Sequence, residues 1–147
     1  MRVAKQILNQ ENGAAAVEFA LLVPALALLV LGIIQFGMVF NSYLQVTHAA
    51  REGVRWAALE RTVGEVESFT IAAAPTLNPS LTAADIRIFL IEGGTESELT
   101  TGGATINDQS KPVKVMVSYA MPINVPIMQS FLGSTLTLVS SATQKVE

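Results

Sequence analysis

The longest uncharged stretch of the chain constrains its fold more than any other feature. Positions 19–50 carry no formal charge when His48 is counted as neutral. Within them, Phe19 to Phe40 would measure about 33 Å as an α-helix, enough to cross a hydrocarbon layer of about 30 Å. This length favours a membrane span over a buried core helix, and it exceeds the apolar core of a cleavable secretory signal. We therefore predict one transmembrane helix near the N-terminus.

Composition supports this prediction and excludes several classes of function. The 147 residues are 50% hydrophobic and only 14% charged, and this length suits one domain plus an anchor. A net charge of −3, without a dense Lys/Arg cluster, removes the electrostatic attraction on which nucleic-acid affinity depends. The chain contains no cysteine, which excludes disulfides and thiolate metal sites. We expect no nucleic-acid partner.

Residues around the span indicate its orientation. Pro24 lies inside it, and membrane helices tolerate such a proline, usually as a kink. Arg2 and Lys5 precede the span, so the positive-inside tendency predicts a cytoplasmic N-terminus, although Arg51 and Arg55 follow the span and weaken the bias. The C-terminal part is therefore expected outside the cytoplasm.

The helical pattern continues beyond the span. Asn41 to Arg61 contains no proline and keeps an apolar stripe, and Gly64 is a plausible helix stop. Ala49, Gly53 and Ala57 recur every four residues and form a smooth helix face of the kind that permits close packing. The sequence leaves open whether this face packs on the protein's own sheet or on a partner helix.

The C-terminal half predicts a small α+β domain. Glu65 to Ala74 could form a second, short helix. Alternating or apolar segments predict strands at Asp85–Ile91, Val113–Ala120 and Leu136–Ala142, which gives a small antiparallel sheet of about three strands. Glu92 to Ser110 contains four glycines and almost no hydrophobic periodicity, and it is predicted to be a long, mobile loop.

Catalytic patterns are missing from the sequence. His48 is the only histidine, and its setting between helical residues favours a membrane-interface or stem-packing role over a general base. The glycine pairs at 93–94 and 102–103 fit no phosphate-binding motif, and the loop carboxylates do not fit the spacing of a calcium loop. We expect no enzyme activity, no metal site and no cofactor.

Glu18 is the unusual residue of the anchor, since it lies at the start of a run that otherwise excludes charge. An ionisable group in a membrane segment is costly to bury, which makes it a functional candidate. Alternatively, it is an interfacial glutamate favoured by the helix dipole near the N-terminus. The residue alone does not decide between these roles.

The sequence around Glu18 resembles the start of a type IV prepilin. Gly13-Ala14-Ala15-Ala16-Val17-Glu18-Phe19 follows a short polar leader, MRVAKQILNQEN. In that family an inner-membrane prepilin peptidase cuts after the glycine. The resemblance implies that Gly13 is the last leader residue, that Ala14 is the new N-terminus and that Glu18 becomes the fifth residue of the mature chain.

The resemblance extends to the TadE-like family, whose members are pilin-like components of Tad (Flp) tight-adherence pili. It is carried by GAAAVEFALLVPALALLVLGIIQFG and by THAAREGVRWAA. Phe19 replaces the tyrosine that often follows the glutamate in the major Flp pilins, and this chain is much longer. Both departures favour a minor pilin or pseudopilin over the bulk filament subunit.

Together these inferences predict four segments: a leader at 1–13, a transmembrane helix at 14–40, an extracytoplasmic stem helix at 41–63 and an α+β domain at 64–147. The resemblance implies residence in the bacterial inner membrane, in contact with its lipid. It also implies three partners: the prepilin peptidase, other pilin-like subunits and the Tad inner-membrane platform. Glu18 and Phe19 are the expected assembly residues. The alternative is an envelope binding module whose leader is never cut.

Overall fold

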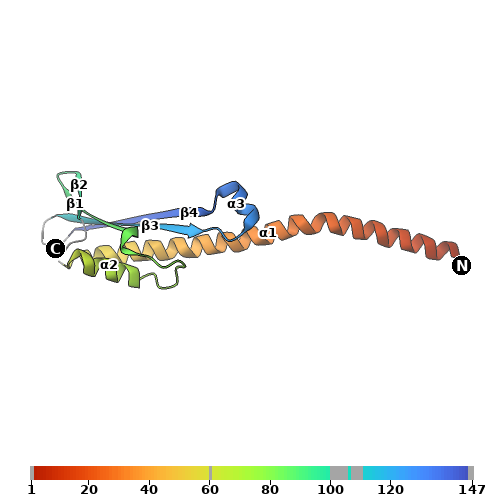
Figure 1. Ribbon diagram of the computed structural model, residues 1–147, viewed down its shortest axis with the longest axis horizontal. Helices are drawn as coiled ribbons and strands as arrows, with labels where there is room; N and C mark the ends of the chain where they lie inside the picture. The colour runs from red at the N-terminus through yellow and green to blue at the C-terminus, as the bar shows by residue number, and fades with distance from the viewer. Residues whose placement is uncertain (1, 60, 100–105, 107–110, 146–147) are drawn as a thin grey trace. The chain divides into compact units, whose positions relative to one another are not determined.

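The computed structural model describes residues 2–59, 61–99, 106 and 111–145, with side chains from Gly13 onward. It divides into two compact units, Met1–Gly37 and Met38–Glu147. One helix, α1 (Arg2–Ala57), supplies the first unit and continues into the second (Figure 1). The second unit adds two helices and an antiparallel sheet, which confirms the predicted α+β class.

Helix α2 (Val63–Ala72) begins at a capping box. The Thr62 backbone N–H donates to Glu65 Oε2 at 3.0 Å, and the Glu65 N–H donates to Thr62 Oγ1 at 3.3 Å. The two N–H groups so satisfied are among those that a helix start leaves without partners. The Thr62 hydroxyl also donates to Glu65 Oε2 at 3.0 Å, and the hydrogen bonds that the Thr62 backbone and hydroxyl donate to this carboxyl lower its pKa.

This cap corrects the predicted end of the stem helix. The sequence predicted helix through Arg61 with a stop at Gly64, whereas α1 ends at Ala57 and Gly64 lies in the first turn of α2. The hydrogen bonds of the Thr62–Glu65 cap start a new helix here, and a cap of this kind contributes about 1 kcal/mol.

The sheet contains four strands in the order β2-β1-β3-β4, with antiparallel pairs throughout. The three predicted strands correspond to β1 (Ile86–Glu92), β3 (Pro112–Pro122) and β4 (Thr135–Lys145). Strand β2 (Thr95–Leu99) was not predicted. A 3-10 turn at Ala83–Asp85 leads into β1, and a short helix, α3 (Pro126–Leu132), connects β3 to β4.

Strand β2 corrects the predicted loop at Glu92–Ser110. Gly93 and Gly94 have φ of 56° and 87°, the backbone that a tight hairpin turn requires, and they fold the chain back on β1. The strand is held by backbone pairing and by charge, since Lys114 Nζ lies 2.8 Å from Glu96 Oε1. Ile106 is also buried, and its N–H donates to the Arg61 carbonyl at 3.2 Å. Positions 100–105 and 107–110 lie outside the described residues.

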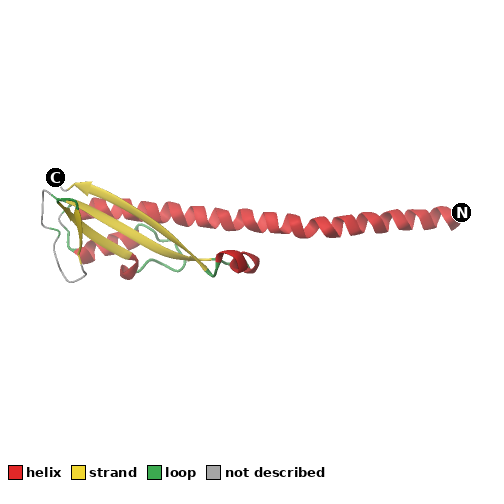
Figure 2. Ribbon diagram, turned by 90° about the horizontal axis from the view of Figure 1, so that it is seen from above, coloured by secondary structure: helices red, strands yellow, loops and turns green. Residues whose placement is uncertain are grey.

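The core lies between one face of the sheet and the two helices α1 and α2 (Figure 2). Alternate residues of β3 face it, and the predicted common face is confirmed because Val113, Val115, Val117 and Tyr119 are all buried. Helix α1 contributes a stripe of apolar side chains that are also buried: Val46, Ala49, Ala50, Val54 and Ala57. The last part of α1 is therefore a core element of the domain.

Gly53 is a point of close approach in this packing. A Cβ placed on Gly53 would collide with Thr70 Oγ1 of α2 and would lie 3.1 Å from Val115 Cγ1 of β3. The Thr70 hydroxyl is fixed there because it donates to the Val66 carbonyl at 2.7 Å. Helix α1, helix α2 and strand β3 thus meet at Gly53, where the surface of α1 has no side chain.

We expect Gly53→Ala to destabilise the domain. Overpacking of this kind costs about 1–3 kcal/mol, which exceeds the gain of up to about 1 kcal/mol from replacing a helical glycine by alanine. The free energy of unfolding of the full chain in detergent, followed through Trp56 fluorescence, measures the difference. The matched control is Gly64→Ala, because nothing lies within 4 Å of a Cβ at that helical position. Equal stability of Gly53→Ala and wild type would show that Thr70 and Val115 yield without cost.

Candidate functional site

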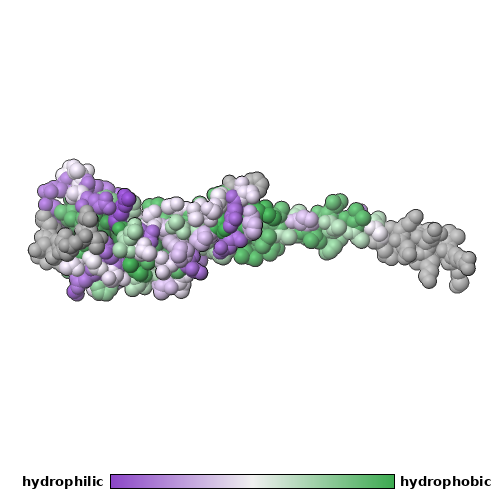
Figure 3. All heavy atoms as spheres, viewed as in Figure 1, coloured by the Kyte–Doolittle hydropathy of each residue, from purple (hydrophilic) through white to green (hydrophobic). Residues whose placement is uncertain are grey.

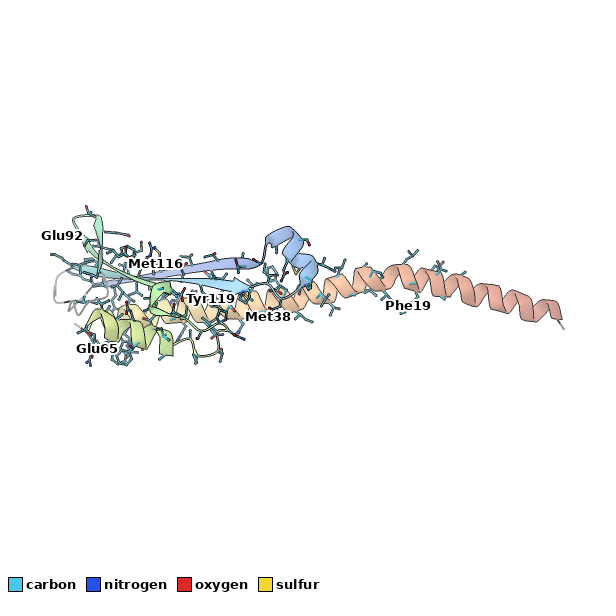
Figure 4. All side chains as sticks on the ribbon, in the orientation of Figure 1. Phe19, Met38, Glu65, Glu92, Met116 and Tyr119 are labelled. Atoms are coloured by element: carbon cyan, nitrogen blue, oxygen red, sulfur yellow. The ribbon has the colours of Figure 1, made fainter. Side chains whose placement is uncertain are left out.

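The apolar segment of α1 from Phe19 to Phe40, called the anchor segment below, exposes most of its apolar side chains. Its most apolar stretch has a mean hydropathy of 2.6 over 18 residues and is 0% buried. Figure 3 shows hydrophobic side chains over most of this segment, and Phe19, labelled in Figure 4, is 66% exposed. A core helix of a water-soluble protein would bury such a stretch. α1 is therefore long and apolar enough to be a single-pass membrane anchor.

Gly13 and Ala14 lie within α1, exposed and in helical conformation. A Cβ added to Gly13 would meet nothing within 4 Å. Cleavage after Gly13 by a protease that binds its substrate as extended backbone would require the helix to unwind there. Glycine lowers the cost of unwinding, because it is about 1 kcal/mol less favourable in a helix than alanine.

Glu18 is exposed on the same helix, four residues after Ala14. Positions separated by four residues lie on one face of a helix. No hydrogen bond or ion pair of Glu18 occurs among the side chains that the structure describes from Gly13 onward. The carboxylate therefore stands beside exposed apolar neighbours such as Leu21 and Leu22.

The stem part of α1 has two different faces. Ala49 and Ala57 are fully buried and, with Gly53, face α2 and the sheet, so the small-residue face packs within the protein's own domain. Of the two arrangements left open by the sequence, the structure has this one, and the face is not free for a partner helix. On other sides of the stem, Phe40 and Tyr43 are 58% and 45% exposed.

A stacked aromatic pair joins α2 to the end of α1, and the sequence did not reveal it. The rings of Trp56 and Phe69 stack with their centroids 4.0 Å apart and their planes 11° apart. Trp56 Nε1 also donates to Glu52 Oε1 at 3.0 Å, and the Arg61 guanidinium lies 5.9 Å from the Trp56 ring. The stacked pair is formed by residues of two helices, so periodicity within one helix could not have identified it.

Two polar contacts join the segment after α2 to the stem. His48 Nδ1 lies 3.3 Å from the Ala73 carbonyl oxygen, and Thr76 Oγ1 donates to Gln45 Oε1 at 2.6 Å. His48 therefore contributes a packing contact of the stem.

Burial raises the pKa of Tyr119, which is a core residue of β3. In the described part of the chain, no three His, Asp or Glu side chains are grouped so as to hold a metal ion.

These observations define a small α+β protein whose single apolar helix serves both as a candidate membrane anchor and as a core element of its domain. Residues 13–55 match the family model of TadE-like proteins, which confirms the resemblance over the anchor and most of the stem. The match includes Gly13, Glu18 and Gly53, whereas α2 and the whole sheet lie beyond it. No curated protein and no solved structure matches the chain.

Proposed function

We propose that this chain is a minor pilin-like subunit, or pseudopilin, or an assembly factor of a Tad-type pilus, and that it acts by association without catalysis. The observation that carries the proposal is Glu18, an exposed carboxylate within the apolar segment that matches TadE-like proteins. A charge in such a surrounding needs a partner, and an assembly of anchors can provide one.

The proposed mechanism begins with removal of the leader. Cutting between Gly13 and Ala14 by a prepilin peptidase creates an ammonium group at Ala14. Glu18 then pairs with the Ala14 ammonium of a neighbouring subunit, and both charges are neutralised in a poorly hydrated layer. Phe19, exposed beside Glu18, contributes apolar contact area between the anchors.

The packing of the stem supports an assembly role for the anchor. The small-residue face at Ala49, Gly53 and Ala57 is already covered by α2 and β3. Contacts with other pilin-like subunits and with the Tad inner-membrane platform must therefore use surfaces that remain exposed, and the anchor is the most extensive apolar one. The protein is proposed to reside in the bacterial inner membrane with its C-terminal domain outside the cytoplasm.

One observation favours a second candidate function. Helix α1 runs without a break through Gly13, so the leader could remain as part of the anchor. The chain would then be a constitutively anchored binding module of the envelope. The state of the leader distinguishes the two functions.

We expect cells that contain a matching prepilin peptidase to hold this protein cut between Gly13 and Ala14. The lost residues include Arg2, Lys5 and Glu11, a net charge of +1, so the net charge changes from −3 to −4. Intact-mass measurement of the purified protein checks the cut, with Gly13→Leu as the variant expected to stay uncut. Only full-length wild-type protein in such cells would favour the uncut binding module.

The proposed orientation places β2 outside the cytoplasm. Because the chain has no native cysteine, Ser97→Cys introduces a single thiol at an exposed position. We expect it to react with an impermeant maleimide in intact spheroplasts. The matched control is Lys5→Cys in cells without the peptidase, which should react only after lysis. The reverse pattern would contradict the orientation.

Glu18→Ala should abolish assembly and leave membrane insertion intact. Removing one partner of a buried ion pair costs about 3–5 kcal/mol, whereas loss of the charge makes the span more apolar. The readouts are membrane fraction, leader removal, crosslinks to other subunits, and surface pili.

Val17→Ala is the control for this experiment, because it shortens an exposed neighbour of Glu18 without changing the charge. Normal crosslinks and normal pili with Glu18→Ala would reduce Glu18 to a glutamate favoured only by its place near the helix start.

A further inference from the structure

Charge is distributed unevenly within the unit Met38–Glu147. Three of its segments carry no formal charge when His48 is counted as neutral: 38–50, 68–84 and 115–144. They belong to different parts of the fold, namely the stem of α1, the end of α2 with its following loop, and the β3–α3–β4 region.

The three uncharged segments meet at one end of the domain. A hollow there is lined by residues from all three, among them Met38 and Asn41, Thr76 and Asn78, and Met121 and Asn124. Figure 4 shows Met38 at this end, with Glu92 at the opposite end of the sheet. Charged residues gather toward that opposite end, where Arg55 and Lys145 line another hollow. We call the end around Met38 the charge-free end.

Helix α3 belongs to the charge-free end, because only its N-cap residue, Val125, separates it from Asn124. The helix starts with Pro126 and is fastened by Gln129, whose Nε2 donates to the Ile123 carbonyl at 2.5 Å. Ile127 and Leu132 nevertheless remain 50% and 55% exposed. A helix this short gains little from its own hydrogen bonds, and contact of its two exposed apolar side chains with an apolar environment would stabilise it.

The continuity of the chain connects this end to the apolar run of α1. Met38 to Phe40 are the last residues of that run, and Asn41 and Tyr43 follow it. The hollow at the charge-free end thus begins where the proposed membrane span leaves the hydrocarbon. Tyr43 is exposed just after the run, and tyrosine favours the boundary between headgroups and acyl chains.

We propose that the charge-free end rests on the surface of the bilayer that α1 spans, and that α3 inserts Ile127 and Leu132 at the boundary between lipid headgroups and acyl chains. The asparagine amides that line the hollow then lie at headgroup level, where water and lipid provide hydrogen bonds. This inference depends on the membrane anchor of the proposed function. A second protein copy could also cover α3, but the absence of charge and the continuity with the apolar run favour lipid.

The test measures the depth of three nitroxide labels in the full chain, reconstituted in phospholipid nanodiscs. Single cysteines replace Leu29 in the anchor, Ile127 in α3, and Leu59 in the turn after α1. The native side chains have similar exposed fractions, 58%, 50% and 57%. Oxygen concentrates in hydrocarbon, whereas a water-soluble nickel chelate is excluded from it, so the ratio of their collision rates reports burial in lipid.

We expect the oxygen-to-nickel ratio at positions 29 and 127 to be several-fold higher than at position 59. A label at 127 that resembles the one at 59, while 29 lies in lipid, would overturn the docking of α3 and leave the anchor intact. A label at 127 shielded from both reagents would also overturn it, since protein would then cover α3. A nickel-accessible label at 29 would contradict the anchor itself, and with it the proposed function.

Discussion

The close approach of α1 to Thr70 and Val115 at Gly53 is the contact on which the rest of the domain depends. It brings one helix against α2 and the sheet at once, and the small residues Ala49 and Ala57 extend the contact along the helix. Without a side chain at position 53, the backbones come near enough to exclude water from the whole stripe. The stacked rings of Trp56 and Phe69 then fix the second helix beside the first.

This packing separates the roles along α1. The stem gives its smooth face to the domain core, so the surface left for other molecules is the exposed apolar segment with Glu18 near its start. The small-residue face of the stem and the exposed apolar segment therefore have different uses. One holds a fold together, and the other is proposed to hold an assembly together.

The sequence predicted those features that depend on local pattern. The absence of charge predicted the anchor, and strict alternation predicted β3 and its buried face. Strand β2 was missed because it is held by pairing with β1 and by a charge contact to Lys114, neither of which leaves hydrophobic periodicity. The end of α1 was readable from Thr62 and Glu65, a capping pattern that the glycine at 64 obscured. Of the site, Gly13 and Glu18 belong to a short local motif, whereas the packing around Gly53 joins distant residues and needed the structure.

Because α1 ends at Ala57, inside the core, its position limits where a protease can release the domain and where the anchor can be exchanged. A protease could free the domain intact only by cutting before Met38, because the compact unit begins there and Met38 and Val39 already pack against its core. A cut further along α1 would separate part of the core from the domain, and the released sheet would lose the surface that covers it. For the same reason, recombination at the boundary between helix and sheet would not give this domain a different anchor. The helix and the sheet share one core and do not form independent parts.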